Sequence, residues 1–186
     1  SVGLGFGLQE IVANFVSGLI ILFERPVRIG DTVTVGQLSG TVSRVRIRAT
    51  TITDWDRKEI IVPNKSFITE QVVNWTLSDP ITRIVVPVGI SYGSDVELAH
   101  KVMEETLRSL PLVLEEPEPR VYFMGFGDSS LNFKLYVHSR QLADRFPLMH
   151  AIHGAILKAL RENGIEIPFP QRDLHIRSTV EGKDPT

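Results

Sequence analysis

SVGLGFGLQEIVANFVSGLIILF, residues 1–23, opens the chain and determines how the rest is interpreted. The segment is apolar and about long enough to cross or enter a bilayer, whereas the remainder is charged and patterned as a mixed β and α/β chain. Three polar residues interrupt it, namely Gln9, Glu10 and Asn14. A carboxylate in hydrocarbon costs about 2.5 kcal/mol or more unless it faces water or protein. We therefore expect a helix that lines a wet path or lies at an interface.

Small residues recur along this segment at helical spacing. Gly3 and Gly7 form one small-xxx-small pair, Ala13 and Ser17 form another, and Gly5 lies within the first. Such residues let helix backbones approach closely where lipid supplies no hydrophobic drive. The segment therefore predicts a pore wall built from several copies of the chain.

Other interpretations of residues 1–23 are a buried core helix, a signal peptide and a nucleotide-binding glycine loop. A signal peptide is disfavoured because no basic region precedes the apolar run and no A-x-A-like cleavage site follows it. A glycine loop is disfavoured because no strand precedes the glycines. Since the chain starts within the apolar pattern, we expect a fragment with further membrane spans upstream.

Composition limits the possible functions. The chain has 186 residues, a net charge of −2 and no cysteine. The near balance of charges gives no overall field that attracts nucleic acid, and the lack of cysteine excludes disulfides, thiol catalysis and thiolate metal sites. Basic residues follow the apolar segment at once, beginning with Arg25 and Arg28, so the positive-inside tendency predicts a cytoplasmic location for most of the chain.

Past Pro26 the sequence changes to short alternating runs separated by turn residues. The runs predict strands at residues 32–35, 40–47, 50–53 and 59–62, and the turn spacing suits the five short strands of a compact barrel. In the second run Val42 is expected to face inward beside Val45 and Ile47. The opposite face is expected to carry a basic stripe of Arg44, Arg46 and Arg48.

From about residue 81 the pattern becomes β-α-β-β-α-β, the order of the ferredoxin-like split βαβ unit. Its expected elements are residues 81–90, 95–109, 120–126, 131–137, 146–162 and a last strand at 174–177. Asp95 is the expected N-cap of the first helix, and Gly164 the stop of the second. The expected apolar stripe of the first helix is Leu98, Val102, Met103 and Leu107.

A set of short motifs runs in order through nearly the whole chain. They include Gly7-Leu8-Gln9, Phe23-Glu24-Arg25-Pro26, Arg28-Ile29-Gly30-Asp31, Gly40-Thr41-Val42, Val62-Pro63-Asn64-Lys65, Val73-Asn74-Trp75, Ser91-Tyr92-Gly93-Ser94-Asp95 and Ile167-Pro168-Phe169-Pro170-Gln171. In this order they resemble the small-conductance mechanosensitive channel (MscS) family. Residues 46–64 look most like its large multi-span members, including the potassium-dependent ones.

This resemblance implies a membrane pore helix at residues 1–26, an all-β Sm-like barrel at 27–75, an α+β, ferredoxin-like cytoplasmic domain at 76–178 with a C-terminal barrel strand, and a loose tail at 179–186. It implies a homoheptamer, a multi-pass protein of the cell inner membrane that opens under tension during hypo-osmotic shock and passes ions and small osmolytes. The lipid bilayer is the implied partner, and nucleic acid, cofactors, metals and enzymatic activity are not expected.

The resemblance also implies roles for single residues of the first segment. It places the pore constriction at Val2 and Phe6, one helical turn apart, where a narrow apolar ring gates by dewetting. The glycines at positions 3, 5 and 7 are the implied sliding contacts between helices.

One departure from the family pattern concerns the kink of this helix. The family's best-known members have glycine after the glutamine, whereas this chain has Glu10 after Gln9. Glutamate lacks the helix penalty of glycine, about 1 kcal/mol, so the kink is expected to move or vanish, with Gly18 as the next candidate hinge. A ring of Glu10 carboxylates would also favour cations over anions.

The alternative function is a membrane-anchored scaffold whose Sm-like module binds nucleic acid or protein. In it Arg44, Arg46 and Arg48 would contact phosphates and Trp55 would stack on a base. Against it stand the negative net charge and the apolar helix, so we expect the three arginines to face the vestibule or a neighbouring subunit. Neither His150 with His153 nor Asp54, Asp56 and Glu59 complete a metal motif.

Overall fold

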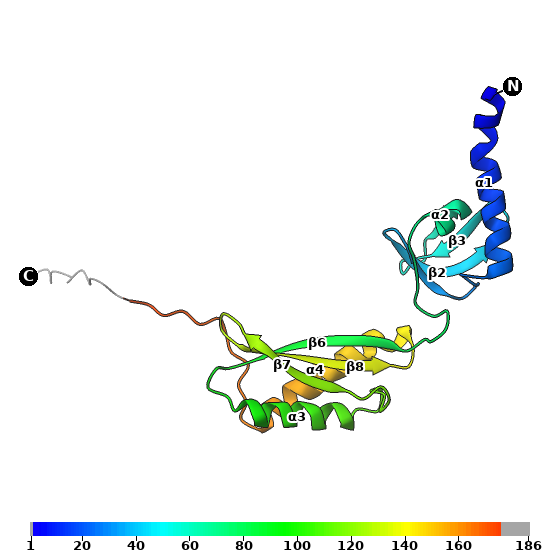
Figure 1. Cartoon of the computed structure of the whole chain (residues 1–186). Helices are drawn as coiled ribbons and strands as arrows, with labels where there is room; N and C mark the ends of the chain where they lie inside the picture. The colour runs from blue at the N-terminus through cyan, green and yellow to red at the C-terminus, as the bar shows by residue number, and fades with distance from the viewer. Residues whose placement is uncertain (1, 176–186) are drawn as a thin grey trace, which may run out of the picture. The chain divides into compact units, whose positions relative to one another are not determined.

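The chain divides into two compact units (Figure 1). The first unit comprises Ser1–Thr82 and Arg140–Ala143, and the second comprises Arg83–Ser139 and Asp144–Thr186. Helix α1 (Val2–Glu24) begins the first unit. This computed structural model describes the backbone of residues 2–175 and the side chains of residues 8–175. The expected tail at 179–186 lies outside the described residues.

In the first unit α1 is followed by a five-stranded antiparallel sheet and a short helix. The elements are β1 (Thr32–Val35), β2 (Leu38–Val45), β3 (Ala49–Thr53), β4 (Glu59–Pro63), α2 (Asn64–Thr69) and β5 (Val72–Asn74). The strand order is β4-β3-β2-β1-β5. Five short strands were expected from the turn spacing, and the four predicted runs agree with β1 to β4 to within about two residues at each end, the usual uncertainty of helix and strand limits.

The core of this unit joins the sheet to both helices. Ile21 of α1 and Phe67 of α2 are buried in one cluster with apolar residues of β1 to β4. The strand and loop members of the cluster are Val27, Val33, Val35, Val42, Ile52 and Val62. The C-terminal half of α1 is therefore part of the β-rich unit's core.

A β-bulge in β2 corrects the expected inward and outward pattern. The pairing with β3 shifts between Val42 and Arg44, so Ser43 is an extra residue on β2. The bulge lets Val42 and Val45 both face the core while Arg44 points out. Because β2 ends at Val45, Ile47 lies in the following turn and is 49% exposed, so its expected inward position is wrong.

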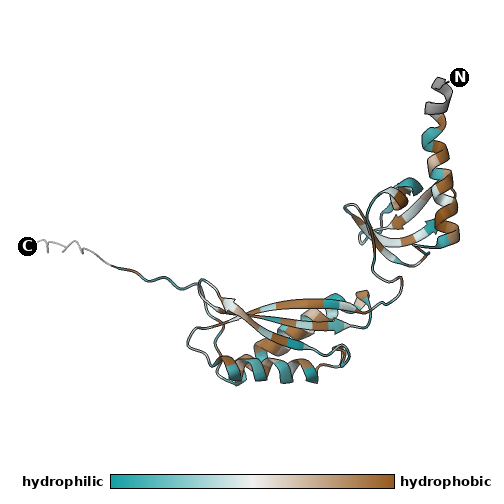
Figure 2. Cartoon of the chain, viewed as in Figure 1, coloured by the Kyte–Doolittle hydropathy of each residue, from teal (hydrophilic) through white to brown (hydrophobic). Residues whose placement is uncertain are grey.

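The second unit packs two helices against one face of a three-stranded sheet of order β6-β8-β7 (Figures 1 and 2). Its elements are β6 (Thr82–Ile90), α3 (Val96–Ser109), β7 (Arg120–Phe126), β8 (Leu131–Ser139), a 3-10 turn (Leu142–Asp144) and α4 (Arg145–Glu162). Inward residues of the strands, such as Val86, Phe133 and Leu135, are buried with Met103 of α3 and Ile152 of α4.

The helix ends of this unit follow the sequence signals. Asp95 accepts hydrogen bonds from the backbone amides of Glu97 (2.9 Å) and Leu98 (3.0 Å), which confirms it as the N-cap of α3. Gly164 adopts φ +68° just after α4, as expected for a left-handed stop. The predicted apolar stripe of α3 needs one correction, since Leu98 is 39% exposed and Ala99 takes the buried position.

The last predicted strand is not formed by the described residues. Between residue 165 and His175 the chain has no helix or strand, and Ile176 and Arg177 lie outside the described part. This segment is held by single contacts, with the Ser91 amide donating to Glu166 O (2.8 Å) and the Gln171 amide to Ser129 Oγ (3.1 Å). The described elements thus give β-α-β-β-α, one strand short of the expected ferredoxin-like order.

Residues 1–23 were expected to be about long and apolar enough to cross a bilayer. In the part of the chain that the structure describes, no helix combines the length and the apolarity of a membrane span.

Candidate functional site

The contact of α1 with the β-rich unit is the most distinctive arrangement in the chain. On α1, Ser17 (6% exposed) and Ile21 (1% exposed) are buried. Between them Gly18 lies against the turn after β2, where a Cβ atom added to this glycine would come within 2.1 Å of the carbonyl oxygen of Ile47. Only a residue without a side chain lets the helix approach this backbone so closely.

Asn64, the first residue of α2, holds the turn between β2 and β3 in place through hydrogen bonds. It is fully buried, and its amide nitrogen Nδ2 donates to Arg46 O (2.8 Å) while its Oδ1 accepts from Thr50 Oγ1 (2.9 Å). Its backbone amide donates to Arg48 O (3.1 Å). Since buried polar groups are costly unless paired, these bonds hold the turn in the position that α1 needs.

Asn14 of α1 supplies the missing cap of α2. The first amides of a helix have no partner within it, and the preceding residue, Pro63, makes no side-chain cap. The second amide, that of Lys65, instead donates to Asn14 Oδ1 (2.9 Å). Asn14 Nδ2 donates in turn to Glu10 O (2.9 Å), so the two helices share one hydrogen-bonded chain.

An ion pair completes this contact one turn further toward the N-terminus. Lys65 Nζ lies 2.8 Å from Glu10 Oε1, and both side chains remain in contact with solvent. Arg48 and Glu10 also line one small cavity of about 240 Å³. The carboxylate that the sequence predicts as the unit of an anionic ring is therefore paired with the ammonium group of Lys65.

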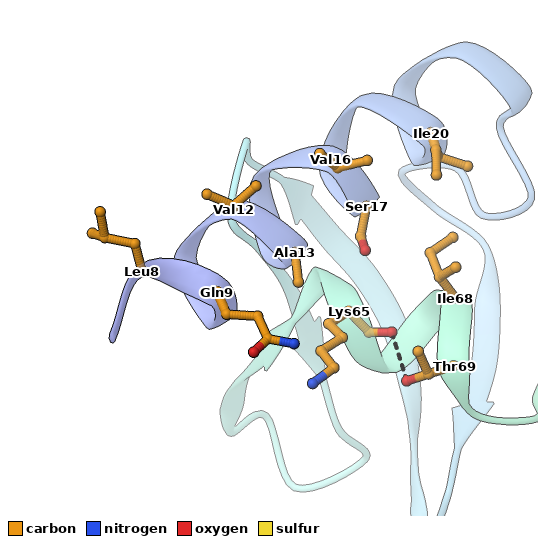
Figure 3. Close-up of a pocket in the computed structure, with 10 residues that line it drawn as sticks. All are labelled: Leu8, Gln9, Val12, Ala13, Val16, Ser17, Ile20, Lys65, Ile68 and Thr69. Atoms are coloured by element: carbon orange, nitrogen blue, oxygen red, sulfur yellow. Dashed lines mark hydrogen bonds between the residues drawn. The ribbon is translucent and has the colours of Figure 1, made fainter. Parts of the chain in front are cut away.

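A mostly apolar groove of about 970 Å³ runs between α1 and α2 (Figure 3). Ala13 and Ser17 lie on the side of α1 that faces α2, where their small size lets the helices approach. The remaining lining residues are Leu8, Gln9, Val12, Val16, Ile20, Lys65, Ile68 and Thr69. The small pair predicted for contacts between copies thus already serves a contact within the chain.

The remaining predicted residues of the first segment are only partly described. Val2, Gly3, Gly5, Phe6 and Gly7 lie in the N-terminal turns of α1, and their side chains are outside the described residues. The helix continues without interruption through Gln9, Glu10 and Gly18. The hinge at these positions stays a prediction.

The basic stripe expected on one strand face is wrong. Only Arg44 lies in β2, where it pairs with Glu59 at 3.0 Å. Arg46 and Arg48 follow the strand in the turn, and it is their carbonyl groups that act, as acceptors for Asn64. The scaffold alternative loses the feature that suggested phosphate binding.

The acidic residues near the β3–β4 turn pair with basic side chains. Lys58 Nζ lies 2.7 Å from Asp56 and 3.9 Å from Asp54. Within residues 8–175 no three metal-ligating side chains come together, His150 and His153 included.

Sequence reasoning missed the roles of Asn64 and Lys65. Pro63-Asn64 stands where β4 ends and α2 begins, and a buried asparagine at that point requires hydrogen-bond partners. The small residue Gly18 in an apolar helix was the corresponding signal on α1.

The chain thus has a helix docked on a β-rich unit, followed along the sequence by an α/β unit. Comparison with known protein families identifies both units. Residues 10–77 match a family described as "Mechanosensitive ion channel, beta-domain", and residues 84–167 match "Mechanosensitive ion channel MscS, C-terminal". These matches define the class as mechanosensitive channel proteins.

Relatives and solved structures agree with this class. The chain is 52% identical to the mechanosensitive channel MscK of Escherichia coli K12, covering 100% of this chain and 18% of that protein. It is 48% identical to the miniconductance mechanosensitive channel MscM of the same organism, covering 98% and 16%. The closed-state crystal structure of Helicobacter pylori MscS superimposes with a TM-score of 0.89 at 26% identity, covering 96% of this chain and 70% of that chain.

The chain belongs to the MscS family, with similarity to its large members MscK and MscM. The chain spans less than a fifth of the length of these two relatives.

Proposed function

We propose that the chain is the pore-proximal part of a mechanosensitive channel subunit that opens under membrane tension and releases ions and small osmolytes. Family membership supports this proposal, and one feature of the structure supports the role of α1 in it. Although α1 docks on the β-rich unit, it still exposes large apolar side chains along its length, namely Leu8, Ile11, Val12, Phe15, Val16, Leu22 and Phe23. Contiguous apolar surface of this kind marks contact with another protein or a membrane.

In this proposal several copies of the chain, a heptamer in our prediction, surround a pore in the inner membrane. Residues 1–26 form the pore-lining helix, the second unit contributes to a cytoplasmic vestibule, and Arg44, Arg46 and Arg48 lie toward the vestibule or a neighbouring copy. Val2 and Phe6 form the constriction, and the glycines at positions 3, 5 and 7 are contacts between helices. These roles rest on the family resemblance and on the spacing of the residues.

Bending of α1 during opening is assigned to Gln9 and Glu10. The close approach of Gly18 to Ile47 O gives that glycine a packing role, which makes it a less suitable hinge than the positions before the contact.

The C-terminal segment is proposed to complete the ferredoxin-like unit or a small barrel at the base of the ring. Leu174 is 85% exposed in this single chain and the segment 165–175 lacks strand partners, as expected for an element that pairs only between copies. Deletion from Asp173 onward should reduce the assembled mass in light scattering, and an unchanged mass would contradict the role.

Patch-clamp recording from liposomes that contain the full-length protein tests the function. Pressure-dependent current is expected, with none in protein-free liposomes. A membrane-anchored scaffold would give no such current.

A further inference from the structure

Lys65 holds its position beside Glu10 through its own backbone. Its amide donates to Asn14 Oδ1 (2.9 Å), and Asn14 Nδ2 donates to the carbonyl of Glu10 (2.9 Å). The Lys65 side chain donates from Nζ to Glu10 Oε1 at 2.8 Å. Two contacts between α1 and α2, and one hydrogen bond within α1, therefore hold the Lys65 ammonium group beside the Glu10 carboxylate.

The Glu10–Lys65 pair is exposed to solvent, so its charges can act on dissolved ions. The Glu10 side chain is 67% exposed and that of Lys65 is 41% exposed. An isolated carboxylate acts on mobile ions over roughly a Debye length, about 8 Å at physiological ionic strength. A carboxylate with a cation at hydrogen-bond distance, as in the Glu10–Lys65 pair, acts as a dipole, whose field declines faster with distance than that of a single charge.

We propose that Lys65 is a selectivity-determining residue of the channel: by neutralising Glu10 it abolishes the cation preference that a ring of free Glu10 carboxylates would create. The inference rests on the proposed function, because it requires α1 to border the ion path. The sequence suggested a ring of free Glu10 carboxylates. In this proposal each Glu10 carboxylate of the ring is instead neutralised by Lys65 of α2. Glu10 and Lys65 then have opposite and mutually cancelling effects on ion preference.

The test measures reversal potentials of tension-activated currents from full-length protein in liposomes under a KCl gradient. Lys65→Gln should change the potassium-to-chloride permeability ratio toward cations by at least about twofold, because each subunit then presents an uncompensated carboxylate. Glu10→Gln should change it toward anions by a similar factor. The double variant should return close to the parental ratio, and Lys65→Arg should retain that ratio.

Lys58→Gln is the matched control, since Lys58 is also an exposed lysine in a 2.7 Å ion pair, with Asp56, but in the β3–β4 turn. It should leave the reversal potential unchanged. Equal reversal potentials in the parental protein and both single variants would overturn the role of Lys65. Absence of any tension-activated current in the parental protein would instead contradict the proposed function, so the two failures are distinguishable.

Discussion

Gly18 of α1 and Ile47 of the β2–β3 turn are in direct backbone contact: a Cβ placed on Gly18 would lie 2.1 Å from Ile47 O and 2.6 Å from Asn64 Nδ2. The helix is thus fixed to the β-rich unit at one point where no side chain fits. Any movement of the helix relative to this unit must either break the contact at Gly18 or occur on the N-terminal side of it.

Gly18→Ala should destabilise the first unit. The added methyl group meets backbone atoms, and overpacking of this kind costs about 1–3 kcal/mol, which exceeds the gain of up to about 1 kcal/mol from removing a glycine from a helix. Both tryptophans, Trp55 and Trp75, belong to the first unit, so the transition in tryptophan fluorescence during urea unfolding measures this unit.

Gly154→Ala is the control for helix propensity, because no atom lies within 4 Å of a Cβ at this position in α4. It should leave the tryptophan transition in place and stabilise α4 by up to about 1 kcal/mol, detected by circular dichroism. Equal stability of the Gly18→Ala and parental chains would show that the contact is looser than described.

Asn64→Ala should destabilise the first unit by about 1–3 kcal/mol, because Thr50 Oγ1 and the Arg46 carbonyl lose a buried partner. The measurement is again the tryptophan transition in urea. Asn163→Ala removes a similar amide-to-carbonyl bond, to Ala159 O (2.8 Å), but at an exposed position. That variant lies in the second unit and should leave the thermal transition measured by circular dichroism nearly unchanged. A tryptophan transition in Asn64→Ala at the urea concentration of the parental chain would contradict the role of Asn64 in holding the turn.

Asp95→Ala should destabilise α3 by about 1 kcal/mol through loss of the two N-cap bonds. Circular dichroism at 222 nm should show a lower midpoint temperature of unfolding, while the tryptophan signal of the first unit stays unchanged. Asp95→Asn keeps the side-chain acceptor and should remain within a few tenths of a kcal/mol of the parental chain. If alanine and asparagine had the same effect, charge and not capping would be responsible.

Local sequence signals predicted most elements because helices, strands and caps depend on periodicity and on short-range bonds. The N-cap at Asp95 and the stop at Gly164 are examples. The exposed position of Ile47 could not be predicted in this way, because alternation along a strand does not show where the strand ends, and β2 ends at Val45.

The sequence also could not predict contacts between segments that lie far apart along the chain. Glu10 and Lys65 are 55 positions apart, and only the docking of α1 on α2 brings their charges together. The sequence therefore predicts a free carboxylate at position 10, whereas the structure pairs it. The last strand, predicted at 174–177, is not formed by the described residues for a related reason, since a strand needs a partner and the described residues provide none for Leu174.

The central claim, that α1 lines the conducting path, is tested most directly by chemical modification within the pore. The chain has no cysteine of its own, so Phe6→Cys in full-length protein freed of other cysteines gives a single reactive thiol. A charged, membrane-impermeant thiol reagent applied while tension holds the channel open should change the single-channel current, and Trp55→Cys, at an exposed position in the β-rich unit, should not respond. Unchanged current through modified Phe6→Cys channels, with labelling verified by mass spectrometry, would contradict the account.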